Sequence, residues 1–438
     1  MNISGWGKFP KHNSKLSKPY NLDELFLLVK NDQSIARGNG RAYGDSAINK
    51  KNTIISKNFN KMISFNDGCL VAESGVLLKD IIDTFLPRGW FPSVSPGTKY
   101  VTVGGMVAAN VHGKNHHNEG SFYNFINWIE LIDKNNDILR ISKDSNKELF
   151  DWTVGGMGLT GFIYRVSFNL KKVGSSWIKQ RSIITKNLEE TLDVFDKVHD
   201  STYSVAWIDC LSGGKNLGRS IVIIGEHAEK KDLTNLANKK LFNLNKKNIF
   251  SIYFNFPKFI LNPVTVKLFN IIIYFKAKYS RKELIVDWDK FFYPLDKILG
   301  WNKIYGKRGF IQFQCVIPLE NAKEGLTEIL KKTYSKNIGS FLTVLKKFGE
   351  GQSGFSFPMP GYTLAMDFPV SRKVLLLLEE LDEIVIKHKG RFYLAKDSRM
   401  TSHVLKKTDE RYKQFKEFRK KNMFEKNYNS EQSLRLDI

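Results

Sequence analysis

The segment 95–117 combines glycines, small residues and histidines in a pattern suited to binding an anionic ligand. It reads SPGTKYVTVGGMVAANVHGKNHH. Glycines let main-chain N–H groups approach an anion closely, because no Cβ stands in the way and unusual φ values are easily adopted. A second segment of the same character, ARGNGRAYGD, lies at 36–45. We therefore expect two loops that together hold one large cofactor through its pyrophosphate.

Three histidines follow the second glycine cluster, at His112, His116 and His117. They could form a metal cluster, but Gly113 discourages a continuous helix and no cysteine lies close by in sequence, so we expect no metal. A single histidine in a glycine-rich loop is better placed to touch a cofactor or a substrate. Since imidazole titrates near neutral pH, it could also transfer a proton.

Polar side chains also stand on two predicted strands in the second half of the chain. Lys396 opens the string KDSR directly after the strand 390–395. It is either a solvated strand end or a cation held where negative charge develops on a cofactor or an alkoxide. Gln312 and Gln314 alternate on one face of the strand 310–317 among apolar neighbours. Inward-facing amides must be hydrogen-bonded, by a polyhydroxylated ligand or by cross-strand partners.

Two glycine motifs resemble nucleotide-binding fingerprints without their context. The string GMGLTG at 156–161 matches G-x-G-x-x-G, but the alternating residues 162–168 predict a strand where a dinucleotide fingerprint opens a helix. We expect a glycine turn into a β-strand beside a ligand. The string RGNGRAYG at 37–44 has one residue too many between its last two glycines, and neither loop ends in Gly-Lys-Ser/Thr. Nucleoside triphosphate hydrolysis is therefore not expected.

The composition bounds the class of protein. The chain has 438 residues, of which 42% are hydrophobic, and a formal net charge of +24. This length can bury two cores, so we expect two domains. The charge could serve nucleic acid, an anionic membrane surface or a phosphorylated substrate, or reflect a nucleotide-biased genome rich in Lys and Asn codons. Zinc-finger spacing, basic-zipper heptads and RNP motifs are missing from the sequence, so no nucleic-acid partner is expected.

Cysteine usage and the N-terminus indicate a cytoplasmic protein. Cys69, Cys210 and Cys315 are widely spaced and form no C-x-x-C pair, which predicts small buried hydrophobic residues in a reducing compartment. Residues 1–8 lack the apolar region of a secretory signal. No apolar run approaches the roughly 18 to 20 residues that a spanning helix needs.

One stretch, 249–279, is apolar and aromatic with lysines interleaved. Pro257 and Pro263 interrupt it, so it cannot be one spanning helix. Two interpretations stay open: an interfacial contact with an anionic membrane, or a buried core segment whose lysines reach solvent. The lysines concerned are Lys246, Lys247, Lys258, Lys267, Lys276 and Lys278.

The elements that must position these residues follow from local pattern. In the first half we expect a helix over 21–30 with Asn21 as its N-cap, strands at 53–56 and 69–73, and a helix over 77–86. The residues 133–137 predict a hairpin turn between strands 128–132 and 138–141. Beyond residue 178 longer amphipathic pieces alternate with strands at 203–209 and 310–317, and a solvated helix is expected over 409–421. The pattern indicates an α+β protein.

The glycine loops resemble a known family. The string RGNGRAYGD at 37–45, with VGG at 103–105 and HG at 112–113, resembles the FAD-binding domain of the vanillyl-alcohol-oxidase type, also called PCMH-type. The resemblance implies a two-domain α+β fold. It has an FAD-binding domain over residues 1–177, a substrate domain with an antiparallel sheet over 178–390, and a C-terminal segment 391–438 that returns to the FAD-binding domain.

Longer strings narrow the resemblance to decaprenylphosphoryl-β-D-ribose 2′-oxidases within that superfamily, the flavoprotein half of an epimerase for mycobacterial cell-wall arabinose. The similarity runs from residues 5–7 to 434–436. The strings are HGKNHH at 112–117, YSVAWID at 203–209, QFQCVIP at 312–318, FPMPGY at 357–362 and AKDSR at 395–399.

The resemblance implies site residues. It assigns FAD binding to Arg37, Gly38, Asn39, Gly40, Arg41, Ala42, Tyr43, Gly44, Asp45, Ser46, Gly97, Thr102, Val103, Gly104, Gly105, Ala109, Asn110, Val111, His112 and Tyr393. It assigns the catalytic, substrate-facing positions to Lys396, His112, Gln314, Tyr305 and Lys346. Some relatives bond flavin covalently at the position of His112, whereas this subfamily binds FAD noncovalently. The cysteine that covalent nitro-aromatic inhibitors attack in the family stands as Ala365 here.

The resemblance also implies a reaction. It is oxidation of a sugar secondary alcohol to a ketone, at the 2′-hydroxyl of a polyprenyl-phosphate-linked pentose, as the first half of an epimerisation for cell-envelope polysaccharide. Lys396 is the expected cation near the reacting oxygen, and the base stays open. A short-chain dehydrogenase and the anionic inner face of the cell membrane are expected partners. Two alternatives are a soluble aldonolactone or alditol oxidase using oxygen, and a basic membrane- or nucleic-acid-binding protein with a vestigial flavin domain.

Overall fold

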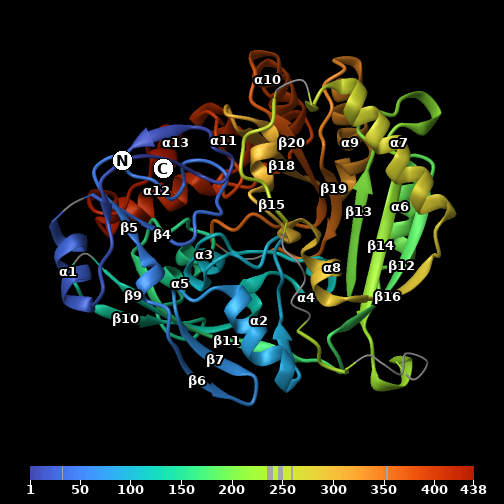
Figure 1. Ribbon diagram of the computed structural model, residues 1–438. Helices are drawn as coiled ribbons and strands as arrows, with labels where there is room; N and C mark the ends of the chain where they lie inside the picture. Colours follow the sequence, from blue (N-terminus) through green and yellow to red (C-terminus); the bar gives the residue numbers. More distant parts are fainter. Residues whose placement is uncertain (32, 134, 234–239, 245–249, 258–259, 352–353) are drawn as a thin grey trace.

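Two large β-sheets lie side by side in the computed structural model and contain most of its strands (Figure 1). The structure describes residues 1–438 except 32, 134, 234–239, 245–249, 258–259 and 352–353. Within that part, helices and antiparallel sheets mix along the chain, which confirms the α+β expectation.

The first sheet is antiparallel and is built from the N-terminal part of the chain. Its strand order is β10 (Ile138–Ile141), β9 (Ile126–Ile132), β11 (Phe162–Lys172), β7 (Cys69–Glu73) and β6 (Met62–Asn66), and β8 (Trp90–Pro92) also pairs with β11. Helices α1 (Leu22–Asn31), α2 (Leu78–Phe85), α3 (Val103–Ala108), α4 (His116–Glu119) and α5 (Lys147–Thr153) accompany it. Two small sheets join β1 (Asn2–Ser4) to β2 (Lys11–Asn13), and β3 (Leu16–Ser17) and β4 (Ile35–Arg37) to β5 (Thr53–Ile55).

Local expectations for this part of the chain are confirmed. Asn21 Oδ1 accepts a hydrogen bond from Glu24 N at 2.9 Å, as an N-cap should, and α1 follows. The strands β9 and β10 pair around the predicted hairpin turn, of which Lys134 lies outside the described residues. The G-x-G-x-x-G string runs into β11 rather than into a helix.

The second sheet has eight antiparallel strands. Their order is β16 (Glu283–Asp287), β12 (Trp177–Thr185), β14 (Ser220–His227), β13 (Tyr203–Ile208), β19 (Thr343–Phe348), β20 (Gly361–Pro369), β18 (Phe310–Pro318) and β21 (Arg391–Phe392). Helices α6 (Leu188–Lys197), α7 (Pro263–Tyr279), α9 (Leu319–Ser335) and α10 (Arg372–Lys387) pack on it, with α8 (Trp288–Phe292) at one end (Figure 1). A parallel pair, β15 (Phe250–Ser251) and β17 (Ile298–Leu299), lies outside it.

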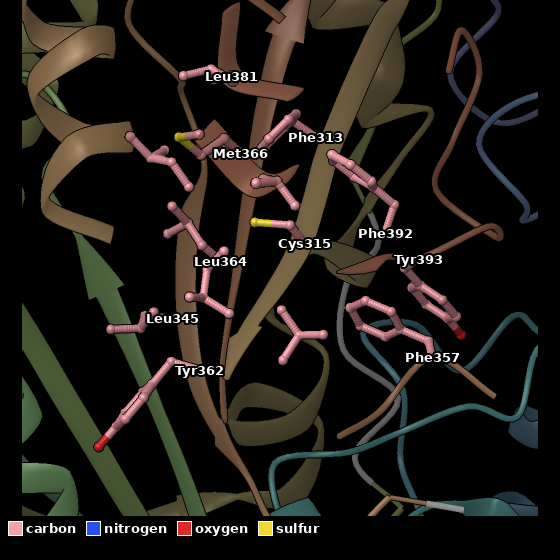
Figure 2. Close-up of a cluster of buried hydrophobic side chains, with 14 of the residues drawn as sticks. Phe313, Cys315, Leu345, Phe357, Tyr362, Leu364, Met366, Leu381, Phe392 and Tyr393 are labelled. Atoms are coloured by element: carbon pink, nitrogen blue, oxygen red, sulfur yellow. The ribbon is translucent and has the colours of Figure 1, made fainter. Parts of the chain in front are cut away.

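Side-chain alternation gives β18, β19 and β20 two different faces. Phe313 and Cys315 of β18 point the same way as Leu364 and Met366 of β20, and Leu381 of α10 closes over them (Figure 2). Each such side chain that is fully buried stabilises the fold by about 1.5 to 3 kcal/mol. Because successive residues of a strand point to opposite faces, this apolar packing turns the intervening residues toward the first sheet.

The two sheets share buried neighbours. The second sheet starts at Trp177, yet Ile178 and Tyr203 belong to the same hydrophobic cluster as Leu70 and Phe168 of the first sheet. The division of the chain into domains at 177 and 390 therefore stays a prediction.

The C-terminal segment forms three short helices beside the N-terminal part of the chain, packed against elements of both large sheets. They are α11 (Ser402–Thr408), α12 (Arg411–Lys421) and α13 (Glu431–Leu436), and both chain ends lie on this side (Figure 1). The expectation of a merely solvated helix over 409–421 is wrong, because Phe415, Phe418 and Arg419 of α12 are buried. Arg435 of α13 binds Asp45 at 2.7 Å and Asp397 at 2.9 Å, so α13 is tied to the first glycine loop.

We predict that Arg435→Met lowers the free energy of unfolding by about 3 kcal/mol, because it leaves two enclosed carboxylates without their cation. Urea unfolding of the purified protein measures this change. The matched control is Lys416→Met, which breaks the exposed ion pair of Lys416 with Asp437 and should cost under about 1 kcal/mol. Equal losses of unfolding free energy in the two variants would contradict a stabilising role for the contacts of Arg435 with the two carboxylates.

Candidate functional site

A cavity of about 310 Å³ lies between the glycine loops and the polar face of the second sheet. The expected FAD-binding residues that line it are Gly38, Asn39, Gly40, Arg41, Ala42, Tyr43, Ser46, Gly97, Thr102, Gly104, Gly105, Ala109, Val111, His112 and Tyr393. The expected catalytic residues that line it are Lys396, His112, Gln314 and Lys346. The tertiary structure thus brings most of the predicted site together from distant parts of the sequence.

The two glycine loops touch directly. A Cβ at Gly38 would lie 2.1 Å from Thr102 Oγ1, so only glycine permits this approach. Asn39 Nδ2 donates to Tyr100 O at 2.8 Å, and Thr102 caps α3 by accepting from Gly105 N at 3.3 Å. The loops therefore form one continuous wall of exposed backbone, as the sequence indicated.

The third glycine segment completes this wall. Met157, Gly158 and Gly161 line the cavity, and Met157 and Gly158 have φ values of 56° and 78°. The sequence indicated a glycine turn beside a ligand here but no individual contact residues. The G-x-G-x-x-G match was the available signal, although its usual structural meaning does not apply.

Five residues expected to bind FAD lie behind the wall instead. Arg37, Gly44, Asp45, Val103 and Asn110 are not among the lining residues. Arg37 donates to a carbonyl of the N-terminal strand at 2.8 Å, and a Cβ at Gly44 would lie 2.1 Å from a carbonyl oxygen of the C-terminal segment. Asp45 is paired with the C-terminal arginine, and Val103 lies in the core. Asn110 accepts from a backbone N–H at 3.0 Å.

These five residues place the loops rather than form the cavity surface. A motif match cannot separate the two roles, because a residue that positions a loop and a residue that touches the ligand are adjacent in sequence.

The opposite wall is the polar face of β18, β19 and β20. Gln314 stands opposite Ala365, and Lys346 stands opposite Thr363 in the strand pairing. Thr363 Oγ1 accepts from Gln314 Nε2 at 3.2 Å. The cavity is thus lined by amide, hydroxyl and ammonium groups on this side, which suits a polyhydroxylated ligand. Ala365 lies among them, so the family's cysteine position faces the cavity.

His112 stands where the two walls meet. Its Nε2 lies 3.4 Å from Gln314 Nε2, and its ring centroid lies 5.0 Å from that of Tyr393 and 4.8 Å from that of Phe348. Burial, reinforced by the positive charge of Lys346, lowers the pKa of His112 well below its ordinary value. The imidazole is therefore neutral at neutral pH.

The two lysines of the cavity differ in their surroundings. Lys396 follows β21, and its Nζ lies 3.9 Å from the centroid of the Tyr43 ring, a cation–π contact. Lys346 has no hydrogen-bond partner among the described residues, and loss of water around it lowers its pKa to about 8. Loss of water lowers the pKa of Lys396 as well, so each of these two lysines loses its proton at a lower pH than an ordinary lysine.

Tyr305 does not line the cavity. Its ring stacks on Phe310 with a centroid distance of 4.3 Å, and Phe310 in turn packs against Tyr43 at 5.2 Å. It supports the cavity wall from behind.

Sequence reasoning missed Asp296 and Trp301, which line the cavity near the first glycine loops. Asp296 accepts hydrogen bonds from Thr98 Oγ1 and Lys99 N, each at 2.8 Å. These residues lie in two short 3₁₀ helices, Pro294–Lys297 and Trp301–Tyr305, that carry no motif of their own, so only the folded chain brings them to the cavity.

Three polar atoms in the cavity walls are buried and lack a hydrogen-bond partner within the described chain: Arg41 Nε, Ser74 Oγ and His112 Nδ1. Buried polar groups are normally hydrogen-bonded, so a polar ligand in the cavity would satisfy them. The residues present therefore fit FAD, whose pyrophosphate would lie on the glycine loops and whose flavin ring would face the sheet.

Comparisons with known proteins agree with this geometry. Residues 27–142 match the family model described as FAD binding domain. Decaprenylphosphoryl-beta-D-ribose oxidase of Mycolicibacterium smegmatis is 34% identical over 375 residues, which cover 84% of this chain and 81% of the relative. A Streptomyces coelicolor protein described as an uncharacterized protein in the mprA 5′ region is 27% identical over 75% of this chain and 91% of its own. D-lactate dehydrogenase of Archaeoglobus fulgidus is 25% identical over 36% of this chain and 39% of its own.

The glycine loops and the polar sheet face thus define an FAD-dependent oxidoreductase of the PCMH type with an α+β fold. Within that class, the chain belongs to the family of decaprenylphosphoryl-β-D-ribose oxidases. The comparisons support neither the alditol oxidase nor the vestigial flavin domain.

We predict that acid precipitation of the purified protein leaves its yellow colour in the supernatant, because the HGKNHH string matches the subfamily that binds FAD without a histidyl bond. The absorbance spectra of supernatant and pellet measure this. His112→Ala is the control, since it removes any residue able to form that bond at this position. Colour that pellets with the parent protein but not with His112→Ala would show a covalent link and contradict the prediction.

Proposed function

We propose that this protein oxidises the 2′-hydroxyl of a polyprenyl-phosphate-linked pentose to a ketone, with FAD as the hydride acceptor. The observation that carries the proposal is a row of polar side chains on the sheet face opposite the glycine loops. The row consists of Gln314, Thr363 and Lys346, with Lys396 beside them. The similarity to the Mycolicibacterium relative, an oxidase of a decaprenylphosphoryl ribose, supports the substrate class.

The chain's own groups have distinct tasks in this proposal. Bound FAD supplies the hydride chemistry. Gln314 and Thr363 hold sugar hydroxyls, so that the carbinol carbon is oriented toward the flavin. Lys396, as a cation, stabilises the negative charge that develops on the reacting oxygen. The aromatic rings of Phe348 and Tyr393 exclude water from one side of the cavity.

His112 acts in this proposal as a hydrogen-bond partner rather than as the group that accepts the proton released by the alcohol. Its depressed pKa means that an imidazolium beside the positive charges of Lys346 and Lys396 is costly to form.

The ketone needs a second enzyme if the sugar is to be epimerised. Reduction of a ketone from the other face is the reaction of a short-chain dehydrogenase, which we propose as the partner. The product would then serve cell-envelope polysaccharide synthesis.

We further propose that the protein meets its lipid-linked substrate at the anionic inner face of the cell membrane. The helix α7 supports this proposal, because both of its faces are apolar. One face buries Val266 and Tyr274, and Tyr274 Oη donates to Thr185 O at 3.2 Å. Its outer face exposes Val264, Leu268, Ile272, Phe275 and Tyr279 in a single stripe.

Exposed lysines flank this stripe at Lys267, Lys276 and Lys278. Of the other lysines that the sequence singled out, Lys246, Lys247 and Lys258 lie outside the described residues, as does Ile249. No helix in the described ranges is long and apolar enough to cross a membrane. An apolar stripe flanked by cations fits the headgroup region of an anionic bilayer.

The stripe lies close to the cavity. Phe269 of α7 contacts Phe341, with ring centroids 4.8 Å apart, and the next residue, Leu342, lines the cavity. Exposed Tyr253 and Phe254 belong to a segment that hydrogen-bonds to residues 299–303, which include the cavity residue Trp301. A lipid tail in the bilayer could therefore stay there while its sugar phosphate reaches the cavity.

We predict that Lys396→Met keeps FAD but lowers kcat, because one preorganised cation is lost. The activation free energy of turnover should rise by about 2 to 4 kcal/mol. Anaerobic flavin bleaching by a polyprenyl-phosphate ribose measures the rate, and visible absorbance measures FAD content. Lys373→Met, at an exposed lysine of α10, is the control and should match the parent. Near-normal turnover in Lys396→Met would reduce Lys396 to a structural role, and failure of the parent to bleach would refute the substrate.

We predict that the protein co-sediments with anionic vesicles and that Lys267→Gln/Lys276→Gln/Lys278→Gln weakens this binding. Each lysine near the surface contributes about 1 kcal/mol, so the triple variant should bind about a hundredfold more weakly. The matched control is Lys51→Gln/Lys57→Gln/Lys61→Gln, which removes the same charge beside β5 and β6, on the far side of the molecule from α7 (Figure 1).

Flavin content should stay unchanged in both triple variants. Binding of the parent should fall in high salt, with a salt-resistant remainder from the apolar stripe. Equal binding by both triple variants, or no binding of the parent, would contradict the docking surface.

A further inference from the structure

Asp367 is a fully buried carboxylate on the same face of the second sheet as the cavity residues, but it is not among the residues that line the cavity. It lies on β20, two residues beyond the cavity residue Ala365, and stands opposite Gln312 of β18 in the strand pairing. Its Oδ1 accepts a hydrogen bond from Gln312 Nε2 at 2.5 Å. Its Oδ2 is buried without a hydrogen-bond partner in the described chain. Burial raises the pKa of Asp367 to about 7, and the hydrogen bond from Gln312 and the positive charge of Lys396 oppose this shift. A carboxylate held this way needs such a positive charge nearby to stay ionised.

The positive charge that acts on Asp367 is Lys396. The two form no ion pair within 4 Å. A chain of contacts connects them instead: Gln312 Nε2, which binds Asp367, lies 3.4 Å from Tyr43 Oη, and Lys396 Nζ lies over the Tyr43 ring. The amide and the phenol thus fix the separation of the two charges.

The other ionisable groups around Lys396 do not offer it a negative charge. They are Lys346 from β19, His112 from the loop after α3, and Tyr43 from the first glycine loop. Tyr305, which supports the cavity wall, is near enough to Asp367 for the charge of Asp367 to act on it. The first two are cationic or neutral, and burial raises the pKa of Tyr43 and of Tyr305 well above the ordinary value, so both phenols are neutral.

We propose that Asp367 is a positioning residue that keeps Lys396 in its cationic form inside the cavity, with Gln312 and Tyr43 setting the distance between the two charges. The proposal gives the catalytic cation of the preceding subsection its counter-charge, and it rests on that function only for the role of Lys396 in turnover.

The direction of the effect follows from the charges. Loss of water around Lys396 lowers its pKa, and the Asp367 carboxylate opposes this. Replacing the carboxylate by a neutral group removes the opposing attraction, so Lys396 loses its proton at lower pH. An opposite charge a few ångströms away shifts a pKa by about one unit or more, so the expected shift is about one pH unit.

The direct test is competitive acetylation of the FAD-loaded protein with acetic anhydride at a series of pH values. The reagent acylates only neutral amines, and mass spectrometry of the peptide containing Lys396 gives its titration midpoint without any substrate. Asp367→Asn keeps the shape and the acceptor for Gln312 but removes the charge. Its midpoint for Lys396 should be about one pH unit lower than in the parent. Asp209→Asn, at a buried carboxylate that pairs with Arg219, is the matched control and should leave the midpoint unchanged.

Gln312→Met provides a second variant if Asp367→Asn loses its flavin. It keeps the carboxyl group but removes its hydrogen bond, which favours protonation of Asp367 and should lower the Lys396 midpoint by a smaller amount. A midpoint that stays unchanged or rises in both variants would overturn the proposal.

Turnover gives an independent readout. With a polyprenyl-phosphate ribose, the alkaline limb of kcat should move to lower pH in Asp367→Asn, while KM changes little. Because acetylation requires no substrate, failure of the proposed oxidation and failure of the Asp367 assignment are distinguishable.

Discussion

The alternation of side chains along β18, β19 and β20 is the constraint on which the site depends. One face of these strands is packed with apolar side chains against α9 and α10, so the register cannot slip by one residue without exposing that face (Figure 2). The same alternation puts Gln312, Gln314 and Lys346 on the other face, toward the flavin loops. Core packing and site chemistry are therefore two consequences of one strand register.

The site contains several lysine ammonium groups in a region with little water. Lys346 and Lys396 face the cavity. Lys114 is not among the lining residues, but loss of water lowers its pKa to about 7, and its ammonium group donates to Phe291 O. Asp296 is a carboxylate in the cavity lining, whereas Asp367 lies on the same face of β20 as Ala365 but outside that lining. This arrangement favours an anionic ligand and the negative charge that forms on an alcohol oxygen during oxidation.

The outer surface of α7, near the cavity, also carries positive charge. The outer face of α7 exposes an apolar stripe flanked by lysines, although its inner face is anchored by Asn270, whose Nδ2 donates to Asp209 Oδ1 at 2.7 Å. The helix is thus held firmly to the sheet while its outer residues remain available to a lipid surface. The cavity lysines and the lysines beside this stripe both contribute to the formal net charge of +24.

The sequence by itself indicated the cofactor loops and the strand that carries Gln312 and Gln314, because glycine spacing and side-chain alternation are local properties of the chain. It left Lys396 open between a solvated strand end and a cation in the site. It could not separate Arg37 and Asn110, which hold the loops, from Arg41, which lines the cavity, since neighbours in sequence point in different directions once folded. The tertiary structure alone decided the place of Asp367 beside the cavity and of Trp301 in its lining. Long-range packing makes those contacts between segments hundreds of residues apart, and no local pattern records it.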